Sequence, residues 1–183
     1  DALKALAEEA AAGSKGGTVD ACVLDQSDDA AVQAFVERVK AEESQVDLLV
    51  NSAYAGLPAI KPHFGKPFWE RPLSVFDASL NIGLRSAYGM SALVAPLMIK
   101  NKAGLIVQIS SFGGVKYLFD VGYGVGKAGL DRLTADMAAE LSPYGVHAVT
   151  LYPGGAVTET AAFPGSETPV FTGRAVAALL NKA

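Results

Sequence analysis

The stretch Val46-Asp47-Leu48-Leu49-Val50 is the clearest indication of how this 183-residue chain folds. All of its side chains except that of Asp47 are apolar, so it lacks the alternation of a strand with one face in water. A short, continuously apolar run is typical of a strand that a parallel sheet buries on both faces. The stretch therefore predicts a buried strand of an α/β fold.

Short apolar runs and segments of helical periodicity alternate on both sides of this strand. The pattern predicts strands at 18–24, 46–50, 104–109 and 146–151 and helices at 1–12, 27–43, 72–100, 121–141 and 171–180. Such alternation is typical of repeated βαβ units, in which a parallel sheet carries helices on both faces. We therefore expect one domain over residues 1–183, built on a doubly wound parallel sheet.

Bulk composition argues against several classes of function. The chain has a net charge of −4, and its acidic and basic residues are mixed along the sequence rather than grouped. Because the sequence has neither a basic patch nor a polybasic segment, we expect no nucleic-acid partner and no anchor of that kind. The longest apolar stretch, 87–99, is too short to span a bilayer and contains Pro96, so we expect no membrane segment.

Thiol and imidazole side chains are few. Cys22 is the only cysteine and has no partner for an internal disulfide, which fits a reducing compartment and a cytoplasmic protein. His63 and His147 are far apart in the sequence, and no spacing typical of metal ligands occurs. We therefore expect no metal site.

Polar residues, or residues that expose the backbone, follow each predicted strand. In chain order they are Asp25, Asn51, Ser110 with Ser111, and Pro153 with Gly154. Ligands of an open α/β sheet bind in the crevice beyond the carboxyl ends of its strands, so these residues are candidates for a binding site. Taken singly, Asp25 is equally consistent with a turn or a helix cap, and Asn51 with a turn.

The run Tyr123-Gly124-Val125-Gly126-Lys127 opens the predicted helix at 121–141. Side chains four residues apart share one helix face, so the phenol and the ammonium lie about one turn apart. The residues that continue this face are Leu130, Thr134, Met137, Ala138 and Leu141. They are mostly apolar, which indicates a buried face, and a buried lysine is costly unless its charge is paired or used. The alternative is a tyrosine in the core and a lysine that reaches solvent.

The glycines of this region form the pattern Gly124-x-Gly126-x-x-Gly129. Its spacing matches that of the dinucleotide-binding fingerprint, but its position in the fold does not. That fingerprint requires a strand that runs directly into a tight turn and a helix. Here a loop separates the strand at 104–109 from the glycines, which lie in the helix itself. We therefore expect them to allow the close approach of neighbouring backbone rather than to bind phosphate.

Together these motifs resemble those of the short-chain dehydrogenase/reductase family, in the family's order and over essentially the whole chain. The matching segments are Leu24-Asp25-x-x-Asp28, Asn51-Ser52-Ala53-Tyr54-Ala55-Gly56, Asn81, Ile109-Ser110-Ser111-x-x-Gly114, Tyr123-x-x-x-Lys127 and Pro153-Gly154-x-x-x-Thr158. Each segment is weak evidence alone, and their succession is strong evidence. The second segment departs from the family pattern, because Ser52 replaces an asparagine and Tyr54 is inserted.

The resemblance implies a Rossmann-like domain that binds NAD or NADP and transfers a hydride between the nicotinamide and a small-molecule carbonyl or secondary alcohol. The catalytic residues that it implies are Tyr123, Lys127, Ser111 and Asn81. The cofactor contacts that it implies are Asp25, Asn51, Ala53, Tyr123, Lys127, Pro153, Gly154 and Thr158. It does not distinguish NAD from NADP.

The chemistry explains these residue types. A tyrosine has an ordinary pKa of about 10 and is a poor base at neutral pH. A nearby cation favours the phenolate, so we expect Lys127 and an oxidised nicotinamide to lower the pKa of Tyr123. Ser111 would hydrogen-bond the carbonyl oxygen, and Asn81 would hold a water that relays protons to Lys127. Ser110 competes with Ser111 for this role, and alignment on Gly114 selects Ser111.

Two segments of the family pattern are missing, namely the opening strand with its glycine-rich phosphate loop and the last strand. We therefore expect a fragment that begins near the family's second helix and lacks pyrophosphate binding. We also expect a homo-oligomer that pairs through the helices at 72–100 and 121–142. The resemblance leaves an association with the endoplasmic reticulum open beside a cytoplasmic location. A non-catalytic binding or oligomerisation module with this fold is the alternative function.

Overall fold

The computed structural model describes residues 2–14, 16–157 and 165–182. The strands of its sheet are β1 (Leu48–Asn51), β2 (Gly104–Ile109) and β3 (Val146–Leu151). They pair in parallel in the order β1-β2-β3, with Ile106 opposite both Leu49 and Ala148. The parallel sheet that the apolar runs predict is therefore confirmed for these three strands.

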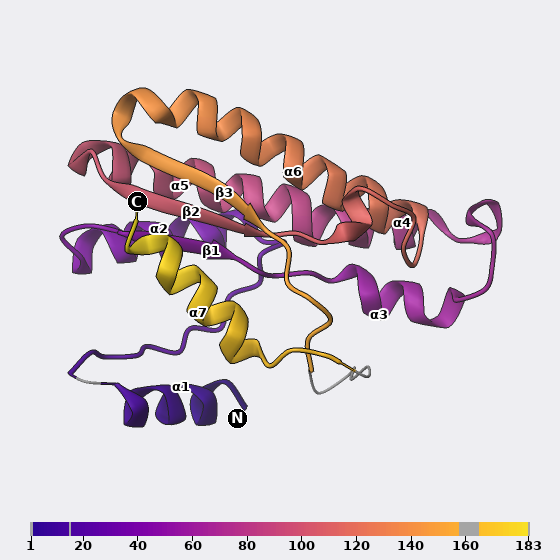
Figure 1. Cartoon of the computed structure of the whole chain (residues 1–183), viewed down its shortest axis with the longest axis horizontal. Coiled ribbons are helices and arrows are strands. Elements are labelled where there is room, and N and C mark those ends of the chain that lie inside the picture. The colour runs from indigo at the N-terminus through magenta and orange to yellow at the C-terminus, as the bar shows by residue number, and fades with distance from the viewer. Residues whose placement is uncertain (1, 15, 158–164, 183) are drawn as a thin grey trace.

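Helices cover both faces of the sheet (Figure 1). One face carries α2 (Asp29–Glu42), α5 (Ser86–Asn101) and α6 (Val121–Leu141). The opposite face carries α7 (Pro169–Leu180). The remaining helices are α1 (Ala2–Gly13), α3 (Gly56–Ile60) and α4 (Leu73–Leu80). The prediction of an α/β fold with helices on both faces is confirmed.

The central strand, β2, separates two apolar clusters. Its Ile106 packs with buried side chains of the first layer of helices, among them Val36 and Met98. Leu105 and Val107 face the other way and pack with Val176 of α7. Successive side chains of a strand point to opposite faces, so a strand covered on both sides must be apolar throughout. This explains the continuous apolar runs in the sequence.

The strand predicted at 18–24 is wrong, because these residues have no regular secondary structure. Val19 and Val23 are 42% and 87% exposed. A strand is stable only when its backbone groups bond to a neighbour, and in the described sheet β1 pairs with β2 alone. An apolar composition without a partner strand is not enough to form one.

The helix predicted at 72–100 is two helices separated by a break. Ile82 and Gly83 leave the helical conformation, with a φ of +149° at Gly83 that glycine tolerates and other residues rarely adopt. The carbonyl of Ile82 accepts a hydrogen bond of 3.1 Å from the N–H of Ala55, which follows β1. The break therefore joins the end of α4 to the carboxyl end of the sheet. Pro96 does not end α5, which continues to Asn101.

The connection between β1 and α4 contains only short helical turns, as the prediction of a loop at 51–71 requires. Beyond α3 it has single 3₁₀ turns at Lys61–His63 and Phe68–Glu70. We call residues 61–72 the aromatic loop, because its Phe64, Phe68 and Trp69 are 52%, 63% and 72% exposed.

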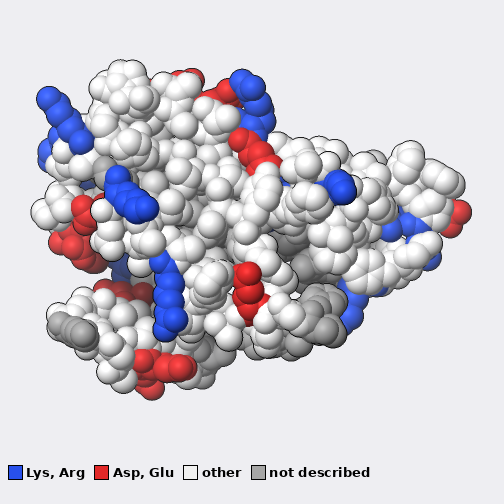
Figure 2. Space-filling view, viewed as in Figure 1, with Lys and Arg blue, Asp and Glu red and all other residues white. Residues whose placement is uncertain are grey.

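Two features of the molecule bear on possible partners. The helical run Leu73–Asn101 has the length and mean hydropathy, 1.3, of a membrane-spanning helix, and 39% of its most apolar window is buried inside the fold. Buried core helices meet the same criteria, and α5 packs on the sheet through Val94 and Met98. On the face drawn in Figure 2, Lys and Arg are interspersed with Asp and Glu and separated by wide uncharged areas.

Candidate active site

The first turn of α6 is fixed by Asp120. This residue is the N-cap of the helix, and its Oδ1 accepts a hydrogen bond of 2.6 Å from the backbone N–H of Tyr123. Aspartate is favoured at this position because its carboxylate satisfies a backbone donor that has no partner within the helix. The cap places Tyr123 in the first turn and Lys127 one turn further along.

The face of α6 that the sequence predicts to be buried is buried. Tyr123, Lys127 and Leu130 are 7%, 9% and 2% exposed. Gly126 lies so close to α4 that a Cβ atom at this position would be 3.1 Å from the backbone oxygen of Ser79. The prediction that glycines of this helix allow close backbone approach is therefore confirmed for Gly126.

Aromatic rings surround the tyrosine of this pair. The Tyr123 ring is nearly perpendicular to those of Tyr54 and Phe119, with centroid distances of 5.5 and 5.1 Å. Burial raises the pKa of Tyr123, and a hydrogen bond with the Ser111 side chain opposes this rise. The phenol is therefore protonated at neutral pH in the protein alone, with the Ser111 hydroxyl beside it.

The lysine of the pair points into the same buried region. Its Nζ donates a hydrogen bond of 2.9 Å to the carbonyl oxygen of Ile109 at the end of β2. It also lies 5.1 Å from the centroid of the Tyr54 ring, and both contacts stabilise a buried ammonium. Burial lowers the pKa of Lys127 to about 8, which the nearby Asp131 carboxylate opposes. Lys127 does not reach solvent in the way that the alternative interpretation requires.

The expected lowering of the Tyr123 pKa by Lys127 and an oxidised nicotinamide stays a prediction for the site with its cofactor. In the protein alone, the pKa of Tyr123 is raised. The Lys127 Nζ bonds to the Ile109 carbonyl and faces the ring of Tyr123, at 5.9 Å from its centroid. Burial in apolar surroundings penalises the phenolate, and its effect on the pKa of Tyr123 outweighs that of the hydrogen bond with Ser111.

The two serines after β2 have different surroundings. Ser111 accepts a hydrogen bond of 3.1 Å from the N–H of Gly113 and bonds with Tyr123. Ser110 is 4% exposed, and its hydroxyl donates to the backbone carbonyl of Lys127 at 3.3 Å. The structure therefore places Ser111, and not Ser110, beside the phenol.

Asn81 lies at the break that follows α4 and is exposed. The end of α4 packs on α6 at Ser79 and Gly126, so the break is close to the buried pair. Among the described residues, no hydrogen bond joins the Asn81 side chain to Tyr123 or Lys127. The structure brings Asn81 to the region without connecting it directly.

A cavity of about 410 Å³ opens at the carboxyl ends of all three strands. Its lining residues include Val50, Ser52, Ile109, Pro153, Ala156 and Thr172. The predicted cofactor residues Ala53 and Gly154 directly follow two of these in the chain. Apolar walls with a few polar groups at the edge are typical of a site for a small organic molecule.

Two predicted cofactor residues direct their side chains into the protein itself. Asn51 donates from Nδ2 to the Ser91 hydroxyl at 3.0 Å and so ties the end of β1 to α5. Asp25 is exposed and accepts hydrogen bonds from the hydroxyl and the N–H of Ser27, which lower its pKa. The geometry at Asp25 is that of the turn in the alternative interpretation. Thr158 lies outside the described residues.

Sequence reasoning missed three side chains of this region. Tyr54 donates from its hydroxyl to the Ser79 hydroxyl at 3.2 Å, and burial raises the pKa of Tyr54 to about 12. Asp120 pairs with Arg71 at 2.9 Å. An aspartate three residues before Tyr123 is an N-cap signal that could have identified Asp120. No local pattern in the sequence marks Arg71 or Tyr54.

Comparison with known sequences shows relatives over most of the chain. The dehydrogenase/reductase SDR family member 1 of Mus musculus is 46% identical over 160 residues, which is 87% of this chain and 50% of the relative. The Homo sapiens protein of the same name is 45% identical over the same shares of each chain. The chain spans about half the length of the curated relatives that it matches.

Solved structures agree with the sequence comparison. A metagenomic short-chain oxidoreductase in complex with NADP has a TM-score of 0.81 and 30% identity, covering 99% of this chain and 75% of that one. A 7 alpha-hydroxysteroid dehydrogenase complexed with NADH and 7-oxo glycochenodeoxycholic acid has a TM-score of 0.76 and 26% identity, covering 95% and 64%. The sequence model of the short chain dehydrogenase family matches residues 1–167, and the chain therefore belongs to that family.

Proposed function

We propose that this chain carries the proton-transfer site and the nicotinamide side of an NAD(P)-dependent oxidoreductase that interconverts a carbonyl and a secondary alcohol. The observation that supports this most is the group of buried Tyr123 and Lys127 with half-buried Ser111 at the carboxyl end of β2. A tyrosine, a lysine and a serine brought together in a buried site are suited to handling a proton at a substrate oxygen.

NAD or NADP is the proposed cofactor. Similar structures hold NADP and NADH, and the cavity at the strand ends has the apolar walls that suit a nicotinamide ring. Pro153 and Ile109 line it, and Lys127 bonds to the carbonyl of the latter, so the cavity and the buried pair share one boundary. When bound, the cofactor supplies or accepts the hydride.

The protein side chains would manage the charge that this transfer leaves on the substrate oxygen. Tyr123 is protonated and would donate its phenolic proton to that oxygen during reduction. Ser111 accepts from the Gly113 N–H and bonds with Tyr123, and its O–H would turn to the substrate oxygen when substrate binds. The Lys127 ammonium would stabilise the phenolate that forms, and Asn81 at the helix break would hold a water on the path of the returning proton.

Replacement of Tyr123 by phenylalanine tests this proposal. Tyr123→Phe keeps the ring contacts and removes the proton donor, so turnover should fall by about 10²–10⁴-fold. Nucleotide binding should persist, as measured by the shift in unfolding temperature with added NAD or NADP. The matched control is Tyr144→Phe, because Tyr144 is 51% exposed and lies in the turn Ser142–Tyr144 that follows α6, far from Tyr123 along the helix. Unchanged turnover in Tyr123→Phe would contradict the proposal and favour the non-catalytic alternative.

We also propose that the protein forms a homo-oligomer through α4 and α6. The observation that supports this is an apolar surface on both helices, where Leu73, Val121 and Val125 are 81%, 42% and 46% exposed. Exposed apolar groups gathered on neighbouring elements are typical of protein interfaces. Sedimentation equilibrium of the native protein measures the assembly, and a monomer at micromolar concentration would contradict it.

A further inference from the structure

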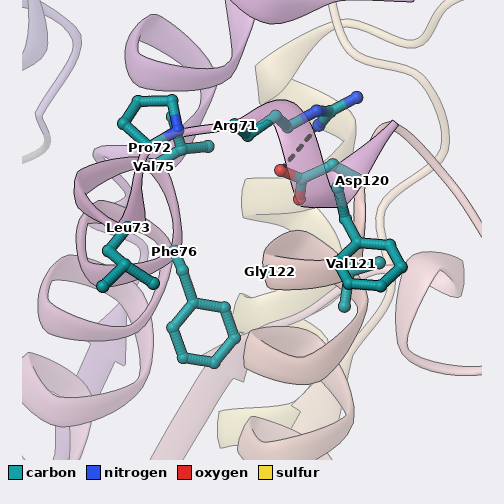
Figure 3. Close-up of a pocket in the computed structure, with 9 residues that line it drawn as sticks. Arg71, Pro72, Leu73, Val75, Phe76, Asp120, Val121 and Gly122 are labelled. Atoms are coloured by element: carbon teal, nitrogen blue, oxygen red, sulfur yellow. Dashed lines mark hydrogen bonds and ion pairs between the residues drawn. The ribbon is translucent and has the colours of Figure 1, made fainter. Parts of the chain in front are cut away.

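A buried ion pair joins the start of α6 to the aromatic loop (Figure 3). Arg71 donates from Nη1 to Asp120 Oδ2 at 2.9 Å, and the two side chains are 7% and 4% exposed. The Nε and Nη2 atoms of Arg71 donate to the backbone carbonyl of Lys66 at 2.9 and 2.7 Å. The guanidinium therefore binds a turn of the loop and the cap of α6 at the same time.

The carboxylate of Asp120 serves two partners with its two oxygens. Oδ1 accepts from the N–H of Tyr123 at 2.6 Å, and Oδ2 accepts from Arg71. Hydrogen bonds to an ionised group are stronger and more directional than those between neutral groups. A displacement of Arg71 would therefore reach the first turn of α6 through one side chain.

The backbone that precedes the cap is strained. Phe119 has a φ of +62°, a left-handed conformation that is unusual for a bulky residue. Such a conformation persists only where the surrounding structure holds it. The Phe119 ring contacts Tyr123 at 5.1 Å and Phe64 of the aromatic loop at 6.3 Å, both between centroids. A second set of contacts thus connects the loop to the tyrosine.

An exposed ion pair elsewhere in the chain shows what is special about the buried one. Arg85 pairs with Asp29 at 2.6 Å, but these side chains are 56% and 71% exposed. Exposed pairs contribute little, whereas removal of one partner from a buried pair leaves a charge without compensation. Arg71 and Asp120 also form part of the wall of a cavity of about 130 Å³, together with Phe68, Phe76 and Val121.

We infer that Arg71 and Asp120 are positioning residues, which hold the Tyr123 phenol in its reactive direction and couple it to the aromatic loop. The inference rests on the proposed function of Tyr123. Neither residue needs to touch the substrate, because Asp120 acts through the cap and Arg71 acts through Asp120. The position of the aromatic loop would therefore influence the rate of the reaction rather than the binding of the nucleotide.

Substitutions of the pair in the native protein test this inference. Asp120→Ala removes both the cap and the charge, and Arg71→Gln leaves the carboxylate unpaired. Each should lower kcat by about 10- to 100-fold while the KM for the nucleotide stays within about twofold. The double variant Asp120→Asn with Arg71→Gln restores a neutral pair and a capping oxygen, so it should recover most of kcat. Arg85→Gln is the matched control and should change neither constant.

Two further measurements do not depend on turnover. Hydrogen exchange at the Tyr123 amide should be about tenfold faster or more in Asp120→Ala, because that N–H loses its acceptor. The fluorescence anisotropy of Trp69, the only tryptophan, should fall in Asp120→Ala and remain unchanged in Arg85→Gln. If Asp120→Ala does not fold, the milder Asp120→Asn and Arg71→Lys are measured in the same way.

The outcomes separate the inference from the proposed function. If folded variants keep the native kcat and only their unfolding temperature falls, the pair is merely structural and the inference is overturned. If the native protein shows no turnover, the proposed function fails. In that case, unchanged exchange at Tyr123 and unchanged Trp69 anisotropy in Asp120→Ala would also refute the coupling, and changes in both would support it.

Discussion

The two halves of α6 differ in almost every property although they form one continuous helix. Residues 121–129 contain four glycines, a buried tyrosine and a buried lysine, and a capping carboxylate begins the helix. Residues 130–141 contain no glycine and bury Leu130, Thr134 and Leu141. Glycines lower helix propensity and a buried ammonium is costly, so the first half is intrinsically unstable.

The difference shows how a helix supports an unfavourable site. The second half packs into the main apolar cluster, to which Leu141 belongs together with Met98 and Val146. Helix formation is cooperative, so this packed half extends its hydrogen-bonded ladder into the first half. The first half is held in addition by its cap and by contact with α4. Stability and chemistry are therefore placed at opposite ends of one element.

The substitution with the largest expected effect on stability lies in the second half of α6. Leu130 is 2% exposed, so Leu130→Ala should lower the free energy of unfolding by about 2–5 kcal/mol. Urea unfolding followed by circular dichroism measures the change. Leu6→Ala is the matched control: Leu6 lies on α1 and is 63% exposed, so the loss should be less than about 0.5 kcal/mol. Equal losses would show that the second half does not anchor the helix.

An intermediate effect tests the cost of the buried charge. The pKa of Lys127 is lowered from 10.5 to about 8, so the folded state binds this proton more weakly than the unfolded state. The resulting destabilisation is complete below pH 8 and decreases as the pH rises toward 10.5. Lys127→Met should therefore raise the free energy of unfolding at pH 7 by up to about 3 kcal/mol, at about 1.4 kcal/mol per pKa unit.

Repetition of these unfolding experiments at pH 9.5 checks the direction in which the destabilisation by Lys127 changes with pH. The advantage of Lys127→Met over the native protein should shrink at that pH, because the native lysine is then largely neutral when folded. Lys40→Met is the control, since Lys40 is 55% exposed and its substitution should show no such trend. A difference between native and Lys127→Met that is the same at both pH values would contradict the assignment.

The smallest expected effect comes from substitutions of two glycines in the first half of α6. A Cβ atom at position 124 would lie 3.4 Å from the Gly113 oxygen, which is an ordinary contact. At position 126 it would lie 3.1 Å from the Ser79 backbone oxygen, which is too close without movement of α4. Gly124→Ala should therefore stabilise by about 0.5–1 kcal/mol through helix propensity, and Gly126→Ala should give no gain or a loss. Equal gains in unfolding free energy would show that α4 does not constrain the helix.

The parts of the fold that sequence predicts well are those with a strong local signal. The runs at 46–50, 104–109 and 146–151 are apolar because helices cover both faces of the sheet. The last two coincide with observed strands, and the first overlaps β1, which begins at Leu48 and ends at Asn51. The run at 18–24 has a similar composition and is not a strand, because pairing depends on a neighbour that composition does not show. The break at Ile82 was missed because Gly83 alone is a weak signal within an apolar helix.

The sequence by itself determined the α/β class, the family and the placement of Tyr123 and Lys127 on one buried helix face. It could do so because these properties follow from spacing along a helix and from ordered motifs. Alignment on Gly114 selects Ser111 over Ser110, and the structure places Ser111 beside the phenol. Only the tertiary structure decided that Asp120 caps the helix while pairing with Arg71. Arg71 and Asp120 are 49 residues apart in the chain, and no local pattern records a contact that folding alone creates.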